Sequence, residues 1–461
     1  MERQIAKSTP AELEKRLHRA IWRWHFYAGI FCIPFVVWLA CTGSIYLFSP
    51  QIERWVDRPY DHLNLSGQKA TPAQIAAAAV AAVPGSVLHY YQLPPGSDAA
   101  TRVEVGVGDR EFRVYVNPVT RRILHVANED DRPMVLLAHL HGQLLMGNWG
   151  SYLMELVASW ALVLLLTGLY LWWPRQAASL AGVLWVRTRK GKRLFWRDLH
   201  AVTGIWVSAF ALFLITTGLP WAAGWGTYFE KIREITGTAA VQEDWTHGRA
   251  SELAQRAARG GNVLNPAEDM PAMHHAIRTL ARQAYTPFNR LVPVAASLHL
   301  AAPVQIFPAA MPGGPWTIQS DSENRTLRNK AQVDPLTGAL VGRENFSQRM
   351  LLDRITDVGI SVHEGQLFGL ANQLLGLATA AGLVTLCVGA VVLWWRRRHV
   401  GVLGAPIPIG RPRWGIGLAL IVLALALYLP AMAISLLLVF LAERWVLARI
   451  PALRRWLGLA A

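Results

Sequence analysis

Four histidines stand at repeated positions beside long apolar segments of the sequence. His25 lies four residues before a glycine and seventeen before a Thr-Gly pair, and His200 has the same spacing. His141 and His363 each precede a glycine by six residues and a Trp-Trp pair by 31. Two imidazoles that approach from opposite sides can serve as the two axial ligands of an iron porphyrin. The spacing therefore predicts two ligand pairs, His25 with His200 and His141 with His363.

The predicted cofactor is non-covalent haem b, two per chain. The three cysteines lie inside apolar segments and form no Cys-x-x-Cys-His sequence, so neither attached haem nor a disulfide framework is indicated. A metal-ion site is the next alternative, although no Asp/Glu/His set accompanies these histidines at ligand spacing. His139 is the second choice as a ligand because it has no counterpart in the second repeat. The alternative for each histidine is that it has no function as a ligand and is only a hydrogen-bonded side chain at a helix end.

Small and aromatic residues lie near and between the two predicted histidine layers. We expect the four glycines of the repeats to leave room for a flat macrocycle or for close helix packing. These are Gly29, Gly204, Gly147 and Gly369. Trp38, Trp160 and Trp206 lie between the layers along the chain and are candidates for a path between them.

The composition is that of a membrane protein. Of 461 residues, 53% are hydrophobic and 16% are charged. The net charge of +15 comes largely from basic residues next to apolar segments, as in 187–193 and 394–398. This distribution is typical of the positive-inside rule and argues against nucleic-acid binding.

The loop charges predict the orientation of the spans. Residues 175–198 hold seven Lys or Arg and one acid, whereas residues 51–138 hold nine and ten. The basic loops and the N-terminus are expected in the cytoplasm and the large loops in the periplasm, across a bacterial inner membrane. The predicted parts, in chain order, are a cytoplasmic helix (1–24), a first span (25–48), an external domain (49–140), a second span (141–174), a basic loop (175–198), a third span (199–222), an external domain (223–362), a fourth span (363–395), a basic loop (396–413), a fifth span or broken hydrophobic helix (414–443) and a basic tail (444–461).

The two external segments are expected to be similar α+β domains. Each contains a tight turn, Asn117-Pro-Val-Thr or Asp334-Pro-Leu-Thr, after alternating strand-like residues such as 101–107 and 315–320. Each also holds a helix candidate, 71–83 or 270–284. The fold class is therefore an α-helical bundle of four core spans and a fifth hydrophobic segment, with two external α+β domains and an internal duplication.

The chain resembles the PepSY-associated transmembrane family, which includes bacterial ferric-siderophore reductases. The residues that match are "RWHFYAGIF", "LHGQLLMGNWG", "RDLHAVTGIW" and "HEGQLFG", with "NPVTRRIL" and "DPLTGAL" in the external domains. The resemblance implies an inner-membrane haem b oxidoreductase that reduces a ferric siderophore in the periplasm. It also implies that His25, His200, His141 and His363 are axial ligands, and that the external domains are PepSY-like.

No dinucleotide-binding, P-loop or HExxH motif is present, so the electrons of this oxidoreductase would come from a quinol or a separate reductase.

Two other functions are alternatives to electron transfer. PepSY domains also occur as propeptide-like inhibitors, so a non-catalytic membrane protein that regulates a secreted peptidase is the alternative. A transporter built on the repeat is disfavoured because we expect no acid and no broken helix within the four spans.

Overall fold

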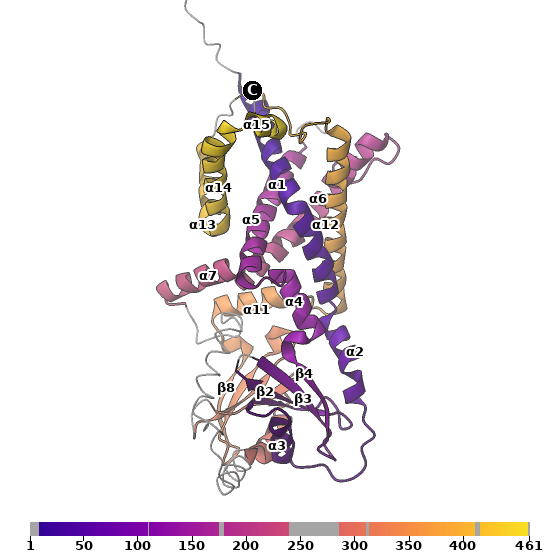
Figure 1. Ribbon diagram of the computed structural model, residues 1–461, viewed down its shortest axis with the longest axis vertical. Helices are drawn as coiled ribbons and strands as arrows, with labels where there is room; N and C mark the ends of the chain where they lie inside the picture. The colour runs from indigo at the N-terminus through magenta and orange to yellow at the C-terminus, as the bar shows by residue number, and fades with distance from the viewer. Residues whose placement is uncertain are drawn as a thin grey trace, which may run out of the picture. The chain divides into compact units, whose positions relative to one another are not determined.

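The computed structural model describes residues 9–108, 110–174, 179–238, 285–309, 313–410 and 415–459. The chain divides into two compact units (Figure 1). The helical unit comprises Met1–Leu47, His139–Ile232 and Leu374–Ala461, and the sheet unit comprises Phe48–Ala138 and Arg233–Gln373. The helix candidate 270–284 lies outside the described residues.

Four helices are long and apolar enough to cross a bilayer, which confirms the four predicted core spans. They are α1 (Pro10–Tyr46), α5 (Gly147–Trp172), α6 (Lys192–Gly218) and α12 (Leu370–Arg397). Helix α1 begins at a capping box in which Thr9 and Glu12 bond each other's backbone. It then continues without a break through 37 residues, so the expected cytoplasmic helix and first span are one element.

The fifth hydrophobic segment folds back on itself. Helices α13 (Ile416–Tyr428) and α14 (Pro430–Leu441) meet at a bend of 118°. Pro430 cannot donate to the preceding turn, which leaves carbonyl oxygens without helical partners. The indole N–H of Trp225 donates to the Tyr428 carbonyl at 2.9 Å, and the Tyr228 hydroxyl donates to the Leu427 carbonyl at 3.0 Å. Both donors lie on α7 (Ala223–Ile235) and satisfy exposed backbone groups where the chain turns.

The tail that follows contacts the N-terminal half of α1. Tyr27 donates to the carbonyl of Leu457 at the end of α15 (Pro451–Leu457), and the Leu403 N–H, from the segment after α12, donates to the Trp456 carbonyl at 2.8 Å. Both ends of the fifth hydrophobic segment are therefore tied to the same end of the bundle. These contacts favour a re-entrant hairpin over a fifth crossing.

The sheet unit contains one antiparallel sheet built from both of the segments that were predicted to be external. The strands are β1 (Val87–Gln92), β2 (Thr101–Val107), β3 (Arg110–Val116), β4 (Ile123–Asn128), β5 (Val304–Phe307), β6 (Trp316–Ser320), β7 (Lys330–Val333) and β8 (Leu340–Glu344). Their order is β4-β3-β2-β1-β5-β6-β7-β8, and β1 pairs with β5 through Tyr91 opposite Ile306 and Gln92 opposite Gln305. The sequence predicted two external domains, whereas the strands of both segments join in a single unit.

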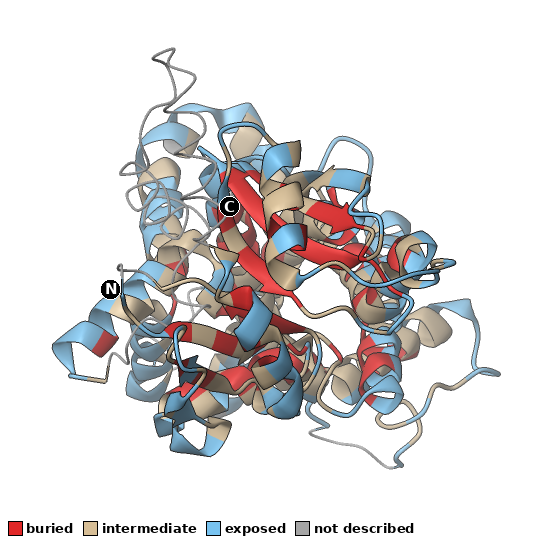
Figure 2. Ribbon diagram, turned by 90° about the horizontal axis from the view of Figure 1, so that it is seen from below, coloured by how far each residue is buried: buried red, intermediate tan, exposed pale blue. Residues whose placement is uncertain are grey.

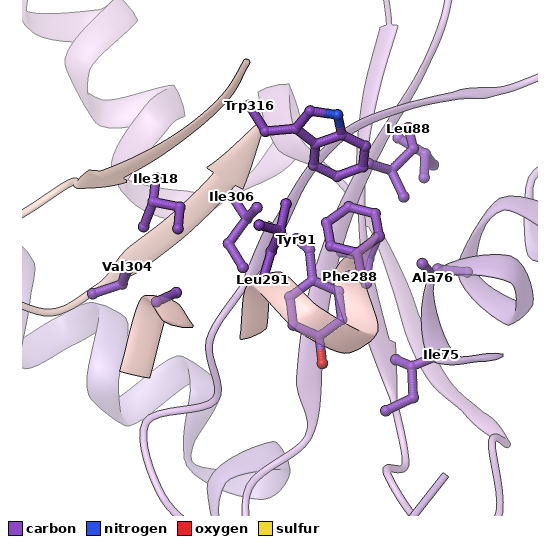
Figure 3. Packing of buried hydrophobic residues seen from close by; sticks show 14 of the residues in the cluster. Ile75, Ala76, Leu88, Tyr91, Phe288, Leu291, Val304, Ile306, Trp316 and Ile318 are labelled. Atoms are coloured by element: carbon purple, nitrogen blue, oxygen red, sulfur yellow. The ribbon is translucent and has the colours of Figure 1, made fainter. Parts of the chain in front are cut away.

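One hydrophobic core lies against one face of this sheet. It is covered by α3 (Pro72–Ala82), which confirms the helix predicted at 71–83, and by α10 (Phe288–Ser297). Phe288 packs edge-on against Trp316 with ring centres 4.8 Å apart (Figure 3). Buried residues gather in the strands of the sheet (Figure 2). In β2 consecutive residues are buried, so both faces of that strand are covered. The opposite face must therefore also be covered, and the residues there are largely polar.

The two tight turns have the same hydrogen bonds. The side-chain oxygens of Asn117 and Asp334 each accept from the backbone N–H groups two and three residues later. The residue four positions later has a left-handed φ in both turns, 61° at Arg121 and 76° at Gly338. The Asx-Pro-x-Thr pattern thus forms the same structure twice.

Candidate functional site

His25 and His200 face each other inside the helical unit. Their ring centres are 6.4 Å apart and the ring planes are 83° apart. His25 lies on α1 and His200 on α6, so the structure brings together the pair that the spacing predicts. A transition-metal ion lies about 2.0–2.1 Å from an imidazole nitrogen, and the ring centre lies roughly 1 Å beyond it, so two rings on one ion have centres about 6 Å apart. The observed separation meets this requirement.

Hydrogen bonds determine which nitrogen of each ring is available as a ligand. The Thr167 hydroxyl donates to the Val163 carbonyl at 2.7 Å, so its oxygen accepts the bond of 2.9 Å from His25 Nδ1. His200 Nδ1 lies 3.0 Å from the Leu386 carbonyl oxygen, which can only accept. Both rings therefore carry their proton on Nδ1. Such partners orient a metal-bound histidine and leave the Nε2 lone pair for the metal.

Glycines lie directly against these two rings. A Cβ atom added to Gly168 would lie 3.3 Å from His25 Cε1, and one added to Gly389 would lie 3.4 Å from His200 Cβ. Gly168 is on α5 and Gly389 is on α12. A larger residue at Gly168 would crowd the His25 imidazole, whereas a Cβ at Gly389 would be in ordinary contact with His200.

His141 is held by the Thr-Gly pair of α1. The Thr42 hydroxyl donates to the Trp38 carbonyl at 2.8 Å, and its oxygen accepts from His141 Nδ1 at 2.9 Å. A Cβ atom on Gly43 would lie 3.2 Å from His141 Cε1. The Thr-Gly pair is repeated in the sequence, but no role was predicted for it. Since Thr42 follows His25 by 17 residues, the two histidine positions are about 26 Å apart along α1.

His141 and His363 both end a short helix that precedes a span. Helix α4 (Pro133–Gln143) contains His141 in its last turn, and α11 (Leu351–His363) ends at His363. The sequence predicted continuous spans from 141 and from 363, whereas α5 begins at Gly147 and α12 at Leu370. Gly147 and Gly369 have φ values of 58° and 57°, which glycine adopts without a steric penalty. The helix is therefore interrupted, with a glycine of left-handed φ, at the same spacing of six residues after each histidine.

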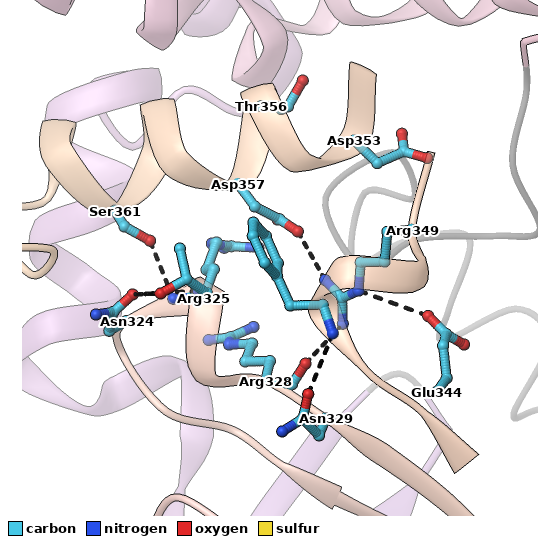
Figure 4. A network of polar contacts seen from close by, with 12 residues as sticks. Asn324, Arg325, Arg328, Asn329, Glu344, Arg349, Asp353, Thr356, Asp357 and Ser361 are labelled. Carbon is cyan, nitrogen blue, oxygen red and sulfur yellow. Dashed lines mark hydrogen bonds and ion pairs between the residues drawn. The ribbon is translucent and has the colours of Figure 1, made fainter. Parts of the chain in front are cut away.

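Helix α11, which carries His363, is fixed to the second half of the sheet unit by polar contacts (Figure 4). Arg349 donates to the Asp357 carboxylate at 2.6 Å. The Ser361 hydroxyl oxygen accepts from the Arg325 N–H at 3.0 Å. Asp357 and Ser361 are almost fully buried and lie one helical turn apart on α11. Their two bonds fix this face of the helix up to two residues before His363. His139, the second-choice ligand, also lies on α4, where its carbonyl accepts from the Leu145 N–H at 3.4 Å.

The comparison with known families was made with the whole chain. The family described as the PepSY-associated TM region matches residues 22–397. The chain belongs to this family. A search of curated proteins gave no match. In this PepSY-associated TM protein the matched region contains all four histidines and all eight strands of the sheet, and it ends where α12 ends. The re-entrant hairpin and the tail lie beyond the match.

The roles expected for some residues of this PepSY-associated TM protein need correction. No atom lies within 4 Å of a Cβ added to Gly147 or Gly369, so these two glycines do not serve close helix packing within the described residues. Gly29 and Gly204 do pack, against Leu164 and Leu386 respectively. Two of the tryptophans expected between the layers are directed elsewhere. Trp160 donates to Ser435 of the re-entrant hairpin, and Trp206 is exposed and donates to the Leu184 carbonyl.

The expectation that the spans contain no acid was wrong. Glu155 lies within α5 and is buried. Its carboxylate accepts from the backbone N–H groups of Gly224 and Trp225, at 3.1 and 3.0 Å. It therefore caps the N-terminus of α7, where a negative charge is favoured. This structural role accounts for the acid without transport.

Proposed function

We propose that this protein is an inner-membrane haem b oxidoreductase that transfers electrons across the bilayer to a ferric siderophore or similar chelate. The observation that carries the proposal is the His25–His200 pair, whose ring separation of 6.4 Å and Nδ1 hydrogen bonds suit two ligands of one iron. Within a span, histidines with this arrangement are expected to be functional. His25 and His200 would hold one haem.

The second haem would be held by His141 and His363. Thr42 fixes the tautomer of His141 as Thr167 does for His25. His363 is assigned by the repeat, since both histidines end a short helix and precede a glycine of left-handed φ by six residues. We also infer an internal duplication, which the matching turns at Asn117 and Asp334 support.

Haem supplies one-electron chemistry at a potential set by its ligands and surroundings. The side chains of this protein would orient the ligands, keep Nε2 unprotonated and exclude water. A quinol or a separate reductase would supply the electron. One electron reduces Fe³⁺ in the chelate to Fe²⁺, and hard oxygen ligands hold the lower charge less strongly, so the iron is released. The basic loops and N-terminus would lie in the cytoplasm and the sheet unit in the periplasm.

A reduced-minus-oxidised visible spectrum of the purified protein tests the proposal. We expect haem b bands from two haems per chain. His25→Ala and His200→Ala should remove the same haem, and His141→Ala and His363→Ala should remove the other. His18→Ala, seven residues before His25 on α1, and His139→Ala are matched controls that should retain both.

Absence of haem bands in protein made with sufficient haem would overturn the proposal. The non-catalytic alternative, regulation of a secreted peptidase, requires no haem and would then be preferred. With haem present, stopped-flow mixing of the reduced protein with a ferric hydroxamate should oxidise the haem and form Fe²⁺ in equal amounts. If the haem stays reduced in the presence of every ferric chelate tried, the haem assignment stands but the ferric reductase activity is rejected.

A further inference from the structure

Three residues that commonly bind metal ions converge in the sheet unit, apart from the haem histidines. They are His89 of β1, Glu104 of β2 and Glu111 of β3. One potential ligand atom from each lies within 4.8 Å of the others. The three strands are adjacent in the sheet, so the backbone holds all three side chains in place.

A β-bulge and a glycine make this convergence possible. The pairing of β1 with β2 shifts between Leu88 and Tyr90, so His89 is the extra residue of the bulge. Bulges of this kind redirect a side chain. The imidazole lies over Gly106, where an added Cβ would be 2.2 Å from His89 Cε1, and Gly106 is paired with Glu111. A side chain at position 106 would displace the ring, so glycine there is required for His89 to approach Glu111.

The charges around the cluster favour a cation. Glu104 and Glu111 are 4% and 6% exposed. Arg113, whose charge also acts on Glu104, bonds the Glu129 carboxylate at 3.0 Å, and Arg132 bonds Glu129 at 2.9 Å. Both arginines therefore share their charge with a further acid. His89 Nδ1 lies 3.5 Å from Glu111 Oε1. Two buried carboxylates that converge on an imidazole are stabilised when a positive ion lies between them.

We propose that His89, Glu104 and Glu111 bind one divalent first-row transition-metal ion. One imidazole and two carboxylates suit Mn²⁺, Fe²⁺ or Zn²⁺, and they provide three ligands with further positions for water. Ligand atoms about 2.1 Å from a common ion lie about 3.0–3.4 Å apart at octahedral or tetrahedral angles. His89 Nδ1 and Glu111 Oε1 are 3.5 Å apart. The three ligand atoms lie within 4.8 Å of one another, so the side chains need to close by less than about 2 Å. The site does not depend on haem, although Fe²⁺ is the ion that the proposed reduction would release.

Metal binding to the purified full-length protein tests this site. After treatment with a chelator and then incubation with Mn²⁺, gel filtration and elemental analysis should give one Mn²⁺ per chain. His89→Ala, Glu104→Gln and Glu111→Gln should each weaken binding at least about tenfold. Anaerobic Fe²⁺ should compete with Mn²⁺ for the same site. His62→Ala is the matched control, because it removes an exposed His–carboxylate pair with Asp98 at 3.2 Å and should leave the stoichiometry unchanged.

Thermal unfolding separates loss of the site from loss of the fold. Mn²⁺ should raise the unfolding temperature of the wild type and of His62→Ala but not of Glu104→Gln, which keeps the shape of the side chain. A wild type without stoichiometric Mn²⁺, or folded variants that bind it as the wild type does, would reject the site. Either result is independent of the haem spectrum.

Discussion

Thr42 and His141 are joined by a hydrogen bond of 2.9 Å between the threonine hydroxyl oxygen and Nδ1 of the imidazole. The first residue belongs to α1 and the second to the short helix before α5, so one bond connects the second histidine position to the helix that carries the first. The bond also assigns the Nδ1–H tautomer. It is the contact by which the proposed function can be tested without removing a ligand.

Thr42→Val should weaken haem binding at His141 by about 10- to 100-fold, because the ligand loses the partner that orients it. The measurement is haem content together with a potentiometric titration, in which one of two midpoint potentials should shift. Thr385→Val is the control, since that hydroxyl donates within its own helix to Ala381. Equal haem content and unchanged potentials in both variants would show that Thr42 has no such role.

Gly147→Ala should destabilise the protein by about 1 kcal/mol or more, because alanine is strained at a φ of 58°. Gly369→Ala should behave in the same way at 57°. Gly142→Ala, within α4 and with no atom within 4 Å of the added Cβ, should be neutral or slightly stabilising. Thermal unfolding in detergent compares the three, and a Gly142→Ala variant that is the least stable would contradict the assigned backbone role.

Stability of the metal-free sheet unit should fall as pH rises from about 4.5 to about 7. Burial and the nearby Glu129 raise the pKa of Glu104 from 4.5 to about 7, partly opposed by Arg113. Between these values the folded state retains protons that the unfolded chain has released, so deprotonation costs folding free energy. The groups that face Glu104 are Tyr90, His89, Glu111, Arg113 and Glu129.

Glu104→Gln should reduce this pH dependence. Denaturant unfolding at several pH values measures it, with up to about 3 kcal/mol expected from a raised carboxyl pKa of this size. Stability that instead rises with pH in the wild type, or a slope unchanged in Glu104→Gln, would contradict the assignment. Saturating Mn²⁺ should also reduce the slope, since the ion competes with protons.

The re-entrant hairpin predicts that the segments on either side of it are accessible from one face of the membrane. Val400→Cys and Ala452→Cys, both at exposed positions, should react with an impermeant thiol reagent from the same side in a Cys41→Ala background. Leu336→Cys, exposed in the sheet unit, should react from the other side under the proposed orientation. Labelling of 400 and 452 from opposite faces would require a fifth crossing.

Local patterns in the sequence predicted much of the fold. Alternation of apolar and polar residues in 101–107 and 111–116 predicted β2 and β3. This signal is local, because successive residues of a strand point to opposite faces of the sheet. The pairing of Tyr91 with Ile306 could not be predicted, because strands from distant segments carry no local signal of each other. The end of α4 was also missed, since the apolar residues 144–146 continue the hydrophobic pattern through the break.

The candidate sites divide in the same way. Spacing alone selected His25 and His200, because the repeat preserves their distances to Gly and Thr-Gly. Their partners were not predicted, since Thr167 and the Leu386 carbonyl depend on how the helices pack. The His89 cluster was missed because strict alternation places His89 opposite to Tyr90, and a bulge, which leaves little trace in sequence, changes its direction.

The pairing of β1 with β5 has a consequence for how the protein is made. Ribosomes synthesise β1 to β4 first, and more than two hundred residues separate Tyr91 from its partner Ile306. Until the later segment has been synthesised and delivered to the same compartment, β1 is an edge strand with free backbone groups, which is where unwanted association begins. A nascent chain stalled after α6 would therefore be exposed to proteases or need a chaperone, and biogenesis of the sheet is complete only when both halves have arrived.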